Sequence, residues 1–286
     1  PEKEQISNEE YLKMFIEAKQ IEGCSARTLQ YYQVTIDHLL KNTDTMIRKI
    51  TTDEIRTYLA EYQQRNNCSK VTVDNVRRNI SSFFSWLEEE DYILKSPMRR
   101  IHKIKTKQPV KEIISDEVIE RLRDNCRCSR DLAMIDLLYS TGIRVGELVG
   151  LNISDIDFEE RECVVYGKGD KERCVYFDAK AKLHLQNYIN SRTDTNPALF
   201  VTLDSPYERL KISGVEIRVR ELGRKLNIEK IHPHKFRRTM ATRAIDKGMP
   251  IEQVQKILGH SQIGTTMQYA IVNQNNVKTS HRRYIA

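Results

Sequence analysis

In the first hundred residues, apolar side chains recur three and four positions apart, which is the spacing of one face of an α-helix. This pattern predicts four helices. Each predicted helix follows a Ser or Thr that can cap its first turn, and two of these also have Glu three positions later, the pattern of a capping box. The predicted caps are Ser7 with Glu10, Ser25, Thr51 with Glu54, and Ser69.

Two of these helices have a clear candidate core face. In the helix after Ser25 the apolar positions are Leu29, Val34, Ile36, Leu39 and Leu40. The helix after Ser69 has a longer apolar stripe. A generic helical bundle would show the same periodicity, so these helices alone do not indicate a function. The stripe consists of Val73, Val76, Ile80, Phe83, Phe84 and Leu87.

The pattern is interrupted between residues 92 and 111, a stretch with seven Lys or Arg, no acidic residue, and prolines at Pro97 and Pro109. We interpret this stretch as an extended basic linker. Basic runs are commonly just solvated segments, but one between two domains can also follow a phosphate backbone, and we favour DNA contact here. The expected contacts are Arg99, Arg100, Lys103, Lys105 and Lys107.

After residue 112 the pattern becomes mixed. Helices are predicted near residues 116–126 and 130–141, a strand-rich stretch at 153–177, and helices again from 179 onward. ECVVY and ERCVYF flank the turn sequence GKGDK, which predicts a β-hairpin with Lys168 at its tip. The expected fold is mainly α with a small β-sheet (α+β). It comprises a helical domain at 1–96, a linker at 97–111 and a mixed domain at 112–286.

Composition agrees with two domains, because 286 residues with 39% hydrophobic side chains can form two cores. The net charge of +7 and the pI near 9.0 favour a polyanionic partner. No apolar run is long enough for a membrane span or a signal peptide, so we expect a soluble cytoplasmic protein without a membrane partner.

The six cysteines are scattered and contain no CxxC pair, so we interpret them as reduced thiols. Cys126 and Cys128 are too few to hold zinc by themselves. We therefore expect neither a metal site nor a cofactor.

Four segments carry candidate chemistry: TGIRVGELVGL, YGKGDKER, HPHKFRRTMAT and LGHSQIGTTMQYA. Cleaving a phosphodiester without a metal requires cationic hydrogen-bond donors for the transition-state oxygens, a proton donor for the leaving oxygen, and a nucleophile. These segments together supply all three. Each alone is weak, since a lone arginine is usually a surface residue and the chain has 13 tyrosines.

Local patterns position these side chains. Gly142 is a predicted helix C-cap, which leaves Arg144 at the start of the next helix. Pro233 suits a helix start and would place His234 and Arg237 on one face of the first turn, although an ordinary basic helix start has the same spacing. Gly259 should end a helix just before His260. Thr265 and Thr266 should then begin a short helix that carries Tyr269.

In this order and at these separations, the four segments closely resemble the tyrosine recombinase or phage integrase family, particularly its compact Xer-like members. The match runs from about Ile114 to Tyr269. The first hundred residues look like the family's core-binding domain, but more loosely. Such family members often carry histidine where this chain has Arg238, so the role of that side chain stays open.

The resemblance implies roles for individual residues. Tyr269 would attack a DNA phosphate to form a 3′-phosphotyrosyl link, without metal or ATP, and Lys168 would protonate the departing 5′ oxygen. Arg144, Arg237 and His260 would stabilise the phosphorane-like charge. His234 would act as general base or contact the phosphate, and Glu147 would orient the site. Lys171, Arg173 and Arg238 are expected to contact DNA.

The resemblance also implies partners: double-stranded DNA with an inverted-repeat core site, bound by four protomers on two sites. The tail after Tyr269 would then form a helix that docks on a neighbouring protomer and gates Tyr269, or equally packs on its own domain. A type IB topoisomerase and a catalytically inactive DNA-binding accessory protein are the alternative functions. Integration of a mobile element, chromosome-dimer resolution and DNA inversion all remain open as biological roles.

Overall fold

A computed structural model describes residues 6–43, 45–106, 112–167, 172–228 and 230–270, together with His281 and Ile285. The chain divides into two compact units, residues 1–110 and 111–286. We describe each unit by itself. Within the described ranges, no helix is both long and apolar enough to cross a membrane.

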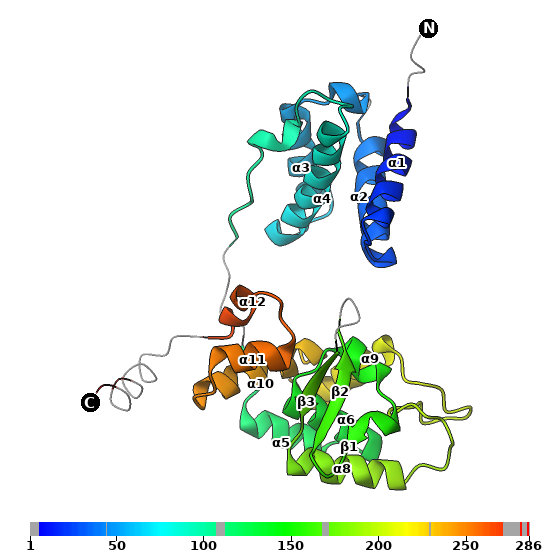
Figure 1. Cartoon of the computed structure of the whole chain (residues 1–286), viewed down its shortest axis with the longest axis vertical. Helices are drawn as coiled ribbons and strands as arrows, with labels where there is room; N and C mark the ends of the chain where they lie inside the picture. Colours follow the sequence, from blue (N-terminus) through cyan, green and yellow to red (C-terminus); the bar gives the residue numbers. More distant parts are fainter. Residues whose placement is uncertain are drawn as a thin grey trace. The chain divides into compact units, whose positions relative to one another are not determined.

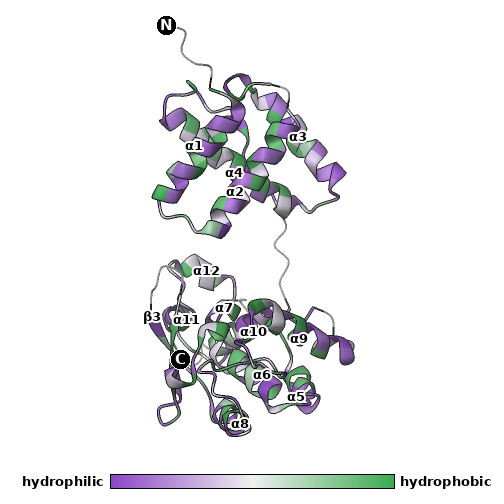
Figure 2. Cartoon of the chain, turned by 90° about the vertical axis from the view of Figure 1, so that its right-hand side faces the viewer, coloured by the Kyte–Doolittle hydropathy of each residue, from purple (hydrophilic) through white to green (hydrophobic). Residues whose placement is uncertain are grey.

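The first unit contains the four predicted helices (Figure 1). The predicted caps are confirmed: complete capping boxes form at Ser7 and Thr51, and the hydroxyls of Ser25 and Ser69 accept first-turn backbone bonds. Figure 2 shows hydrophilic and hydrophobic positions interspersed along these helices. The elements are α1 (Asn8–Ile21), α2 (Ala26–Lys41), the 3-10 helix η1 (Ile47–Lys49), α3 (Thr52–Arg65), α4 (Lys70–Glu89) and the 3-10 helix η2 (Pro97–Arg100).

The core of this unit is apolar and rich in aromatic rings. The predicted α4 stripe is buried, and the rings of Phe15 and Phe83 meet edge to face with their centroids 5.2 Å apart. The prediction for Val34 in α2 is wrong, because this side chain is 61% exposed. Its neighbour Thr35 faces inward instead, and its hydroxyl accepts a hydrogen bond from the buried Asn79 amide.

The first unit continues beyond residue 96, where we expected the linker to begin. Met98 in η2 is buried, and the backbone N–H of Ile104 donates to the buried Asp74 carboxylate over 3.0 Å. Arg99 pairs with Glu88, so this basic side chain already has an acidic partner. The start of the expected linker therefore packs against α3 and α4. Lys107 lies outside the described residues.

In the second unit a small sheet lies among helices (Figure 1). The sheet is antiparallel in the order β1-β2-β3, and the predicted hairpin is confirmed as β2 and β3. Lys168 and Lys171, in the connection between these strands, lie outside the described residues. The elements are α5 (Asp116–Asp124), α6 (Ser129–Thr141), α7 (Val145–Gly150), the 3-10 helix η3 (Ile153–Asp155), β1 (Ile156–Asp157), β2 (Glu162–Tyr166), β3 (Glu172–Tyr176), α8 (Ala179–Asn190), α9 (Ile212–Lys225), α10 (Pro233–Asp246), α11 (Ile251–Leu258) and α12 (Ile263–Met267).

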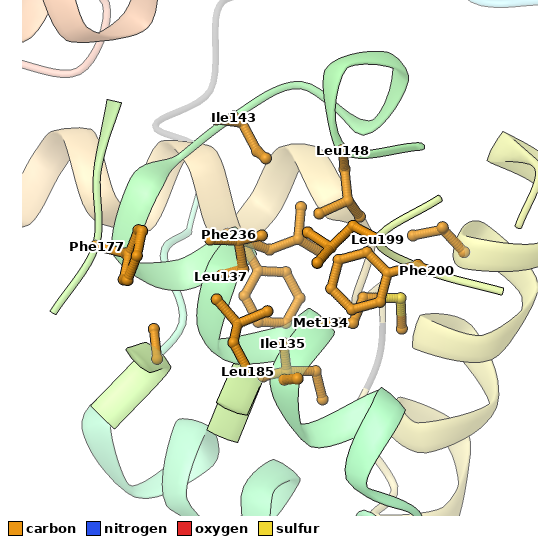
Figure 3. Close-up of a cluster of buried hydrophobic side chains, with 14 of the residues drawn as sticks. Met134, Ile135, Leu137, Ile143, Leu148, Phe177, Leu185, Leu199, Phe200 and Phe236 are labelled. Carbon is orange, nitrogen blue, oxygen red and sulfur yellow. The ribbon is translucent and has the colours of Figure 1, made fainter. Parts of the chain in front are cut away.

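Helix α6 is the centre of this unit, because it packs against both α8 and α10. Figure 3 shows Met134 and Leu137 of α6 beside Phe236 of α10, and all three are fully buried. The predicted C-cap Gly142 ends α6 with φ of +62°, and a Cβ there would lie 2.3 Å from the Cε of Met240. Glycine thus lets the turn between α6 and α7 approach α10 closely. This approach brings Arg144 near Arg237.

Candidate active site

Arg144 is the N-cap residue of α7, so the predicted helix start is confirmed. Glu147 closes this turn: its carboxylate accepts from the backbone N–H of Arg144 over 2.7 Å and from the Arg144 guanidinium over 2.8 Å. The Arg144 side chain remains 35% exposed. Glu147 therefore holds one edge of the Arg144 guanidinium, and the rest of the group is accessible to solvent.

Arg237 enters the same region from α10 and is only 3% exposed. Its Nη1 donates to the carbonyl of Gly142 over 2.8 Å, and its Nη2 donates to the carbonyl of Leu258 over 2.6 Å. Burial and the nearby Arg144 lower the pKa of this guanidinium. A buried cation held by neutral carbonyls suits a site that binds an anion, since the protein itself neutralises little of its charge.

The C-terminus of α11 organises the arginines. A helix leaves its last carbonyls without intrahelical partners, and its dipole favours cations at that end. Three successive carbonyls there accept from three arginines: Ile257 from Arg173 over 2.8 Å, Leu258 from Arg237 over 2.6 Å and Gly259 from Arg144 over 3.1 Å. The end of one helix thus gathers cations from β3, α10 and the start of α7.

His260 follows directly and has a defined tautomer. Its Nε2 lies 3.0 Å from Nη2 of Arg237, and its Nδ1 lies 2.9 Å from the hydroxyl of Thr266. Arginine can only donate, so Nε2 is the acceptor and the proton of the neutral ring sits on Nδ1. Burial, Arg237, Arg144 and Arg173 lower the pKa of His260 to about 4, so the ring is neutral at pH 7.

Tyr269 lies beside this histidine. The prediction that Thr265 and Thr266 begin a helix carrying Tyr269 is wrong in register: α12 spans Ile263–Met267, and Tyr269 comes two residues after it, with its backbone N–H bonded to the Thr266 carbonyl. The Tyr269 and His260 rings are stacked with centroids 6.1 Å apart. The tyrosine also packs on the small apolar cluster formed by α10 and α11.

Other predicted residues are less closely engaged. His234 is exposed on the first turn of α10, where Pro233 takes the predicted first helical position. Partial desolvation, Arg237 and Arg144 lower the pKa of His234. Arg238 donates to the backbone carbonyl of Glu112 over 3.3 Å. The described residues thus bring Arg144, Glu147, Arg237, His260 and Tyr269 together, with His234 at the edge.

Arg173 occupies a different position from the DNA-contacting one that we expected. Its side chain is 11% exposed, and two of its nitrogens each donate to one oxygen of Glu147 over 2.7 Å. The sequence contained a signal for this position. Side chains two apart in a strand point to the same face, and Arg173 shares its face with the buried Val175.

Comparison with known proteins shows the family of the chain. The phage integrase family matches residues 112–276, and the N-terminal SAM-like domain of phage integrases matches residues 11–94. The chain belongs to the phage integrase family. It is a tyrosine recombinase, an enzyme of site-specific recombination, and both the predicted family and the predicted α+β fold class are confirmed.

Relatives match over nearly the whole chain. Tyrosine recombinase XerC of Leptospira interrogans is 31% identical, with 99% of this chain and 95% of the relative covered. Tyrosine recombinase XerC of Oceanobacillus iheyensis is 29% identical, with coverage of 96% and 95%. Among solved structures, XerA recombinase is 28% identical with a TM-score of 0.55 and coverage of 98% and 99%. The Tn1549 transposon integrase in complex with a circular intermediate DNA has a TM-score of 0.78 at 19% identity, with coverage of 96% and 98%.

Proposed function

We propose that this recombinase cleaves and rejoins double-stranded DNA through a covalent link between Tyr269 and a 3′ phosphate. The observation that carries this proposal is the convergence of Arg144, Arg237 and His260 at the end of α11, with the Tyr269 ring stacked on the histidine. Two cations held partly by neutral carbonyls provide the donors that a phosphoryl transition state needs. The Tyr269 phenol is a nucleophile beside these donors, because its ring stacks on the histidine that Arg237 contacts.

The proposed step balances without a metal. The Tyr269 phenol oxygen forms a bond to phosphorus and gives its proton to His234 acting as general base. If His234 contacts the phosphate instead, the proton passes to solvent water. The bond from phosphorus to the 5′ oxygen breaks, and that oxygen takes a proton from Lys168. Arg144 and Arg237 stabilise the charge on the non-bridging oxygens, and His260 orients Arg237 by accepting a hydrogen bond at Nε2. Attack by a partner strand's 5′ hydroxyl then reverses the step and releases Tyr269.

We further propose that the substrate is a core site with inverted repeats and that four protomers act on two such sites. Solved relatives support this assembly: one structure is a lambda integrase tetramer bound to a Holliday junction, with a TM-score of 0.74 at 19% identity. The basic residues Arg100, Lys103 and Lys105 are exposed on the segment after α4, so they are available to contact phosphates. Integration or excision of a mobile element and Xer-type resolution are both compatible with this chemistry.

A nicked suicide duplex carrying the recombination site tests the proposal, because loss of the short cleaved strand traps the covalent intermediate. We expect a protein–DNA adduct with the unchanged chain and none with Tyr269→Phe, while both bind the duplex equally. Tyr176→Phe is the matched control, since this exposed tyrosine is in β3 of the same unit. An undiminished adduct from Tyr269→Phe would refute the assignment.

A further inference from the structure

Arg173 is a cation next to the site whose side chain is only 11% exposed, and the proposed chemistry assigns it no step. It is the second residue of β3 and pairs with Val165 of β2, so it is in the second residue pair from the connection that carries Lys168. Its side chain extends from the buried face of the sheet to two other elements. Nη1 and Nη2 donate to the two carboxylate oxygens of Glu147, and Nε donates to the Ile257 carbonyl.

The neighbouring backbone is adapted to this side chain. Gly259 adopts φ of +62°, and a Cβ at this residue would lie 3.0 Å from both Cδ and Nη1 of Arg173. A side chain at this position would therefore be strained by the backbone and would also press on the guanidinium. The end of α11 thus closes onto Arg173, one residue before His260.

The charges indicate what Arg173 does for its neighbours. Burial alone would raise the pKa of Glu147, but hydrogen bonds from Arg173 and Arg144 outweigh burial and hold that pKa below its usual value. Glu147 is thus a carboxylate shared by two arginines. Two cations and one anion leave one net positive charge, and Arg144 is the more exposed of the two cations. Without Arg173, the carboxylate would neutralise Arg144 alone.

We propose that Arg173 is a positioning residue for the recombination chemistry. It neutralises Glu147 and fixes the end of α11, so that the Arg144 charge is free for the DNA phosphate and His260 keeps its place. Arg173 acts through Glu147 and Ile257 and does not touch the DNA. The inference rests on the proposed function of Arg144 and His260.

Single-turnover cleavage of the suicide duplex at saturating protein tests this role. We expect Arg173→Met to form the Tyr269 adduct roughly 100-fold more slowly with unchanged DNA affinity, because small displacements of catalytic groups cost about this much. Arg173→Lys keeps the charge but loses the two-point contact, so its rate should be intermediate. The matched control is Arg192→Met, which removes a similarly buried arginine bonded to Asp194 and to backbone carbonyls away from the site. It should lower thermal stability and leave the adduct rate unchanged.

A second substitution separates positioning from a general structural role. In Arg173→Met/Glu147→Gln the uncompensated carboxylate is gone. If Arg173 is a positioning residue, the double variant should therefore cleave about tenfold faster than Arg173→Met. If Arg173 only supported the fold, removing the Glu147 charge as well would lower the rate further. A further fall in the double variant, or an Arg173→Met rate equal to that of the unchanged chain, would overturn the proposal.

The free protein gives an independent readout that does not depend on the cleavage chemistry. Arg173 is one of the cations that depress the pKa of His260, and its loss also frees the Glu147 charge. Titration of the His260 ring by NMR should therefore show a raised pKa in Arg173→Met and an unchanged pKa in Arg192→Met. An unchanged His260 pKa in Arg173→Met would count against the inference. Failure of the unchanged chain to form any adduct would instead count against the proposed function.

Discussion

The two units bury different kinds of side chain. Among the described residues of the first unit, Asp74 is the one buried charged side chain, and the other buried polar side chains are the uncharged Thr35, Asn79 and Ser96. The described part of the second unit buries five charged side chains: Arg130, Asp131, Asp136, Glu147 and Arg237. Burying charges is costly unless they are paired, so a unit that buries many has either a structural network or a use for them.

Partners distinguish these two cases within the second unit. Arg130 and Arg218 both pair with Asp131, and Arg123 and His184 both contact Asp136. The arginine contacts are ion pairs that join α5, α6 and α9, and His184 of α8 adds a hydrogen bond to Asp136. Arg237 differs, because its hydrogen bonds go to two carbonyls and a neutral imidazole. Uncompensated positive charge, more than burial itself, marks the active site.

The largest effect that would test this comparison is expected at Arg237. Replacing it with Met removes a phosphate donor and leaves the carbonyls of Gly142 and Leu258 without their partner. We expect adduct formation to fall by about 10³-fold in a single-turnover assay, as for loss of an oxyanion donor. Arg130→Met, from the structural network, should lower stability but retain the adduct rate of the folded protein. Equal losses of rate in both variants would remove the distinction.

Substitutions in the apolar core of the first unit should lower its stability and leave the rate of adduct formation unchanged. Phe83 is fully buried, so Phe83→Ala should lower the free energy of unfolding of this unit by about 3–5 kcal/mol. The only tryptophan of the chain, Trp86, lies in the same core and reports unfolding in denaturant by fluorescence. Val71→Ala, at a position that is 53% exposed, is the control and should change stability by less than about 0.5 kcal/mol. A Phe83→Ala effect as small as that of the control would show that this core is loosely packed.

A smaller effect is expected at Thr266. Its hydroxyl accepts the Nδ1 proton of His260, so Thr266→Val, which has the same shape without the hydroxyl, removes the group that fixes the tautomer. We expect roughly tenfold slower adduct formation and a change in the imidazole nitrogen shifts measured by NMR. Thr266→Ser restores the hydroxyl and should restore both. Unchanged nitrogen shifts in Thr266→Val would contradict this account of His260.

The basic segment after α4 should affect binding only. Lys103 and Lys105 are exposed, whereas Arg99 pairs with Glu88. Replacing Lys103 or Lys105 with Gln should weaken binding to unrelated duplexes and reduce the slope of log K against log salt by about one per residue. Arg99→Gln should change the slope less. A uniform slope across all three variants would show that the ion pair with Glu88 makes no difference.

A further effect is expected in the pH dependence of stability. The pKa of His260 is about 4 in the folded chain and about 6.5 when unperturbed, so the unfolded state binds more protons between these values. His260 therefore makes stability fall as pH decreases from about 6.5 towards 4. His260→Asn should show a shallower fall in denaturant titrations across this window. An equally steep fall would mean that His260 does not titrate with a lowered pKa.

The sequence predicted the fold well wherever a short local pattern determines the structure. Periodicity and capping residues located the helices of the first unit, and the strand pattern located the hairpin. Val34 was misassigned because periodicity alone does not say which edge of an apolar face meets the core. Pairing of Glu147 with Arg173 joins residues 26 apart, and no local pattern encodes it.

The same limit applies to the site. Helix ends could be predicted because caps are local. Gly142 and Gly259 marked the helix ends that precede Arg144 and His260, and Pro233 marked the start of the helix that carries Arg237. The gathering of three arginines at the α11 carbonyls depends on contacts between distant segments, such as Arg144 with Gly259. Only the folded chain reveals these contacts.

The most direct test of the central claim is to identify the residue that becomes attached to DNA. After reaction with the suicide duplex, the trapped complex is digested with protease and nuclease, and the peptide that retains a nucleotide is sequenced by mass spectrometry. The account predicts a phosphodiester on Tyr269, with its DNA strand joined through the 3′ end. Attachment at any other residue, or attachment through a 5′ end, would contradict it.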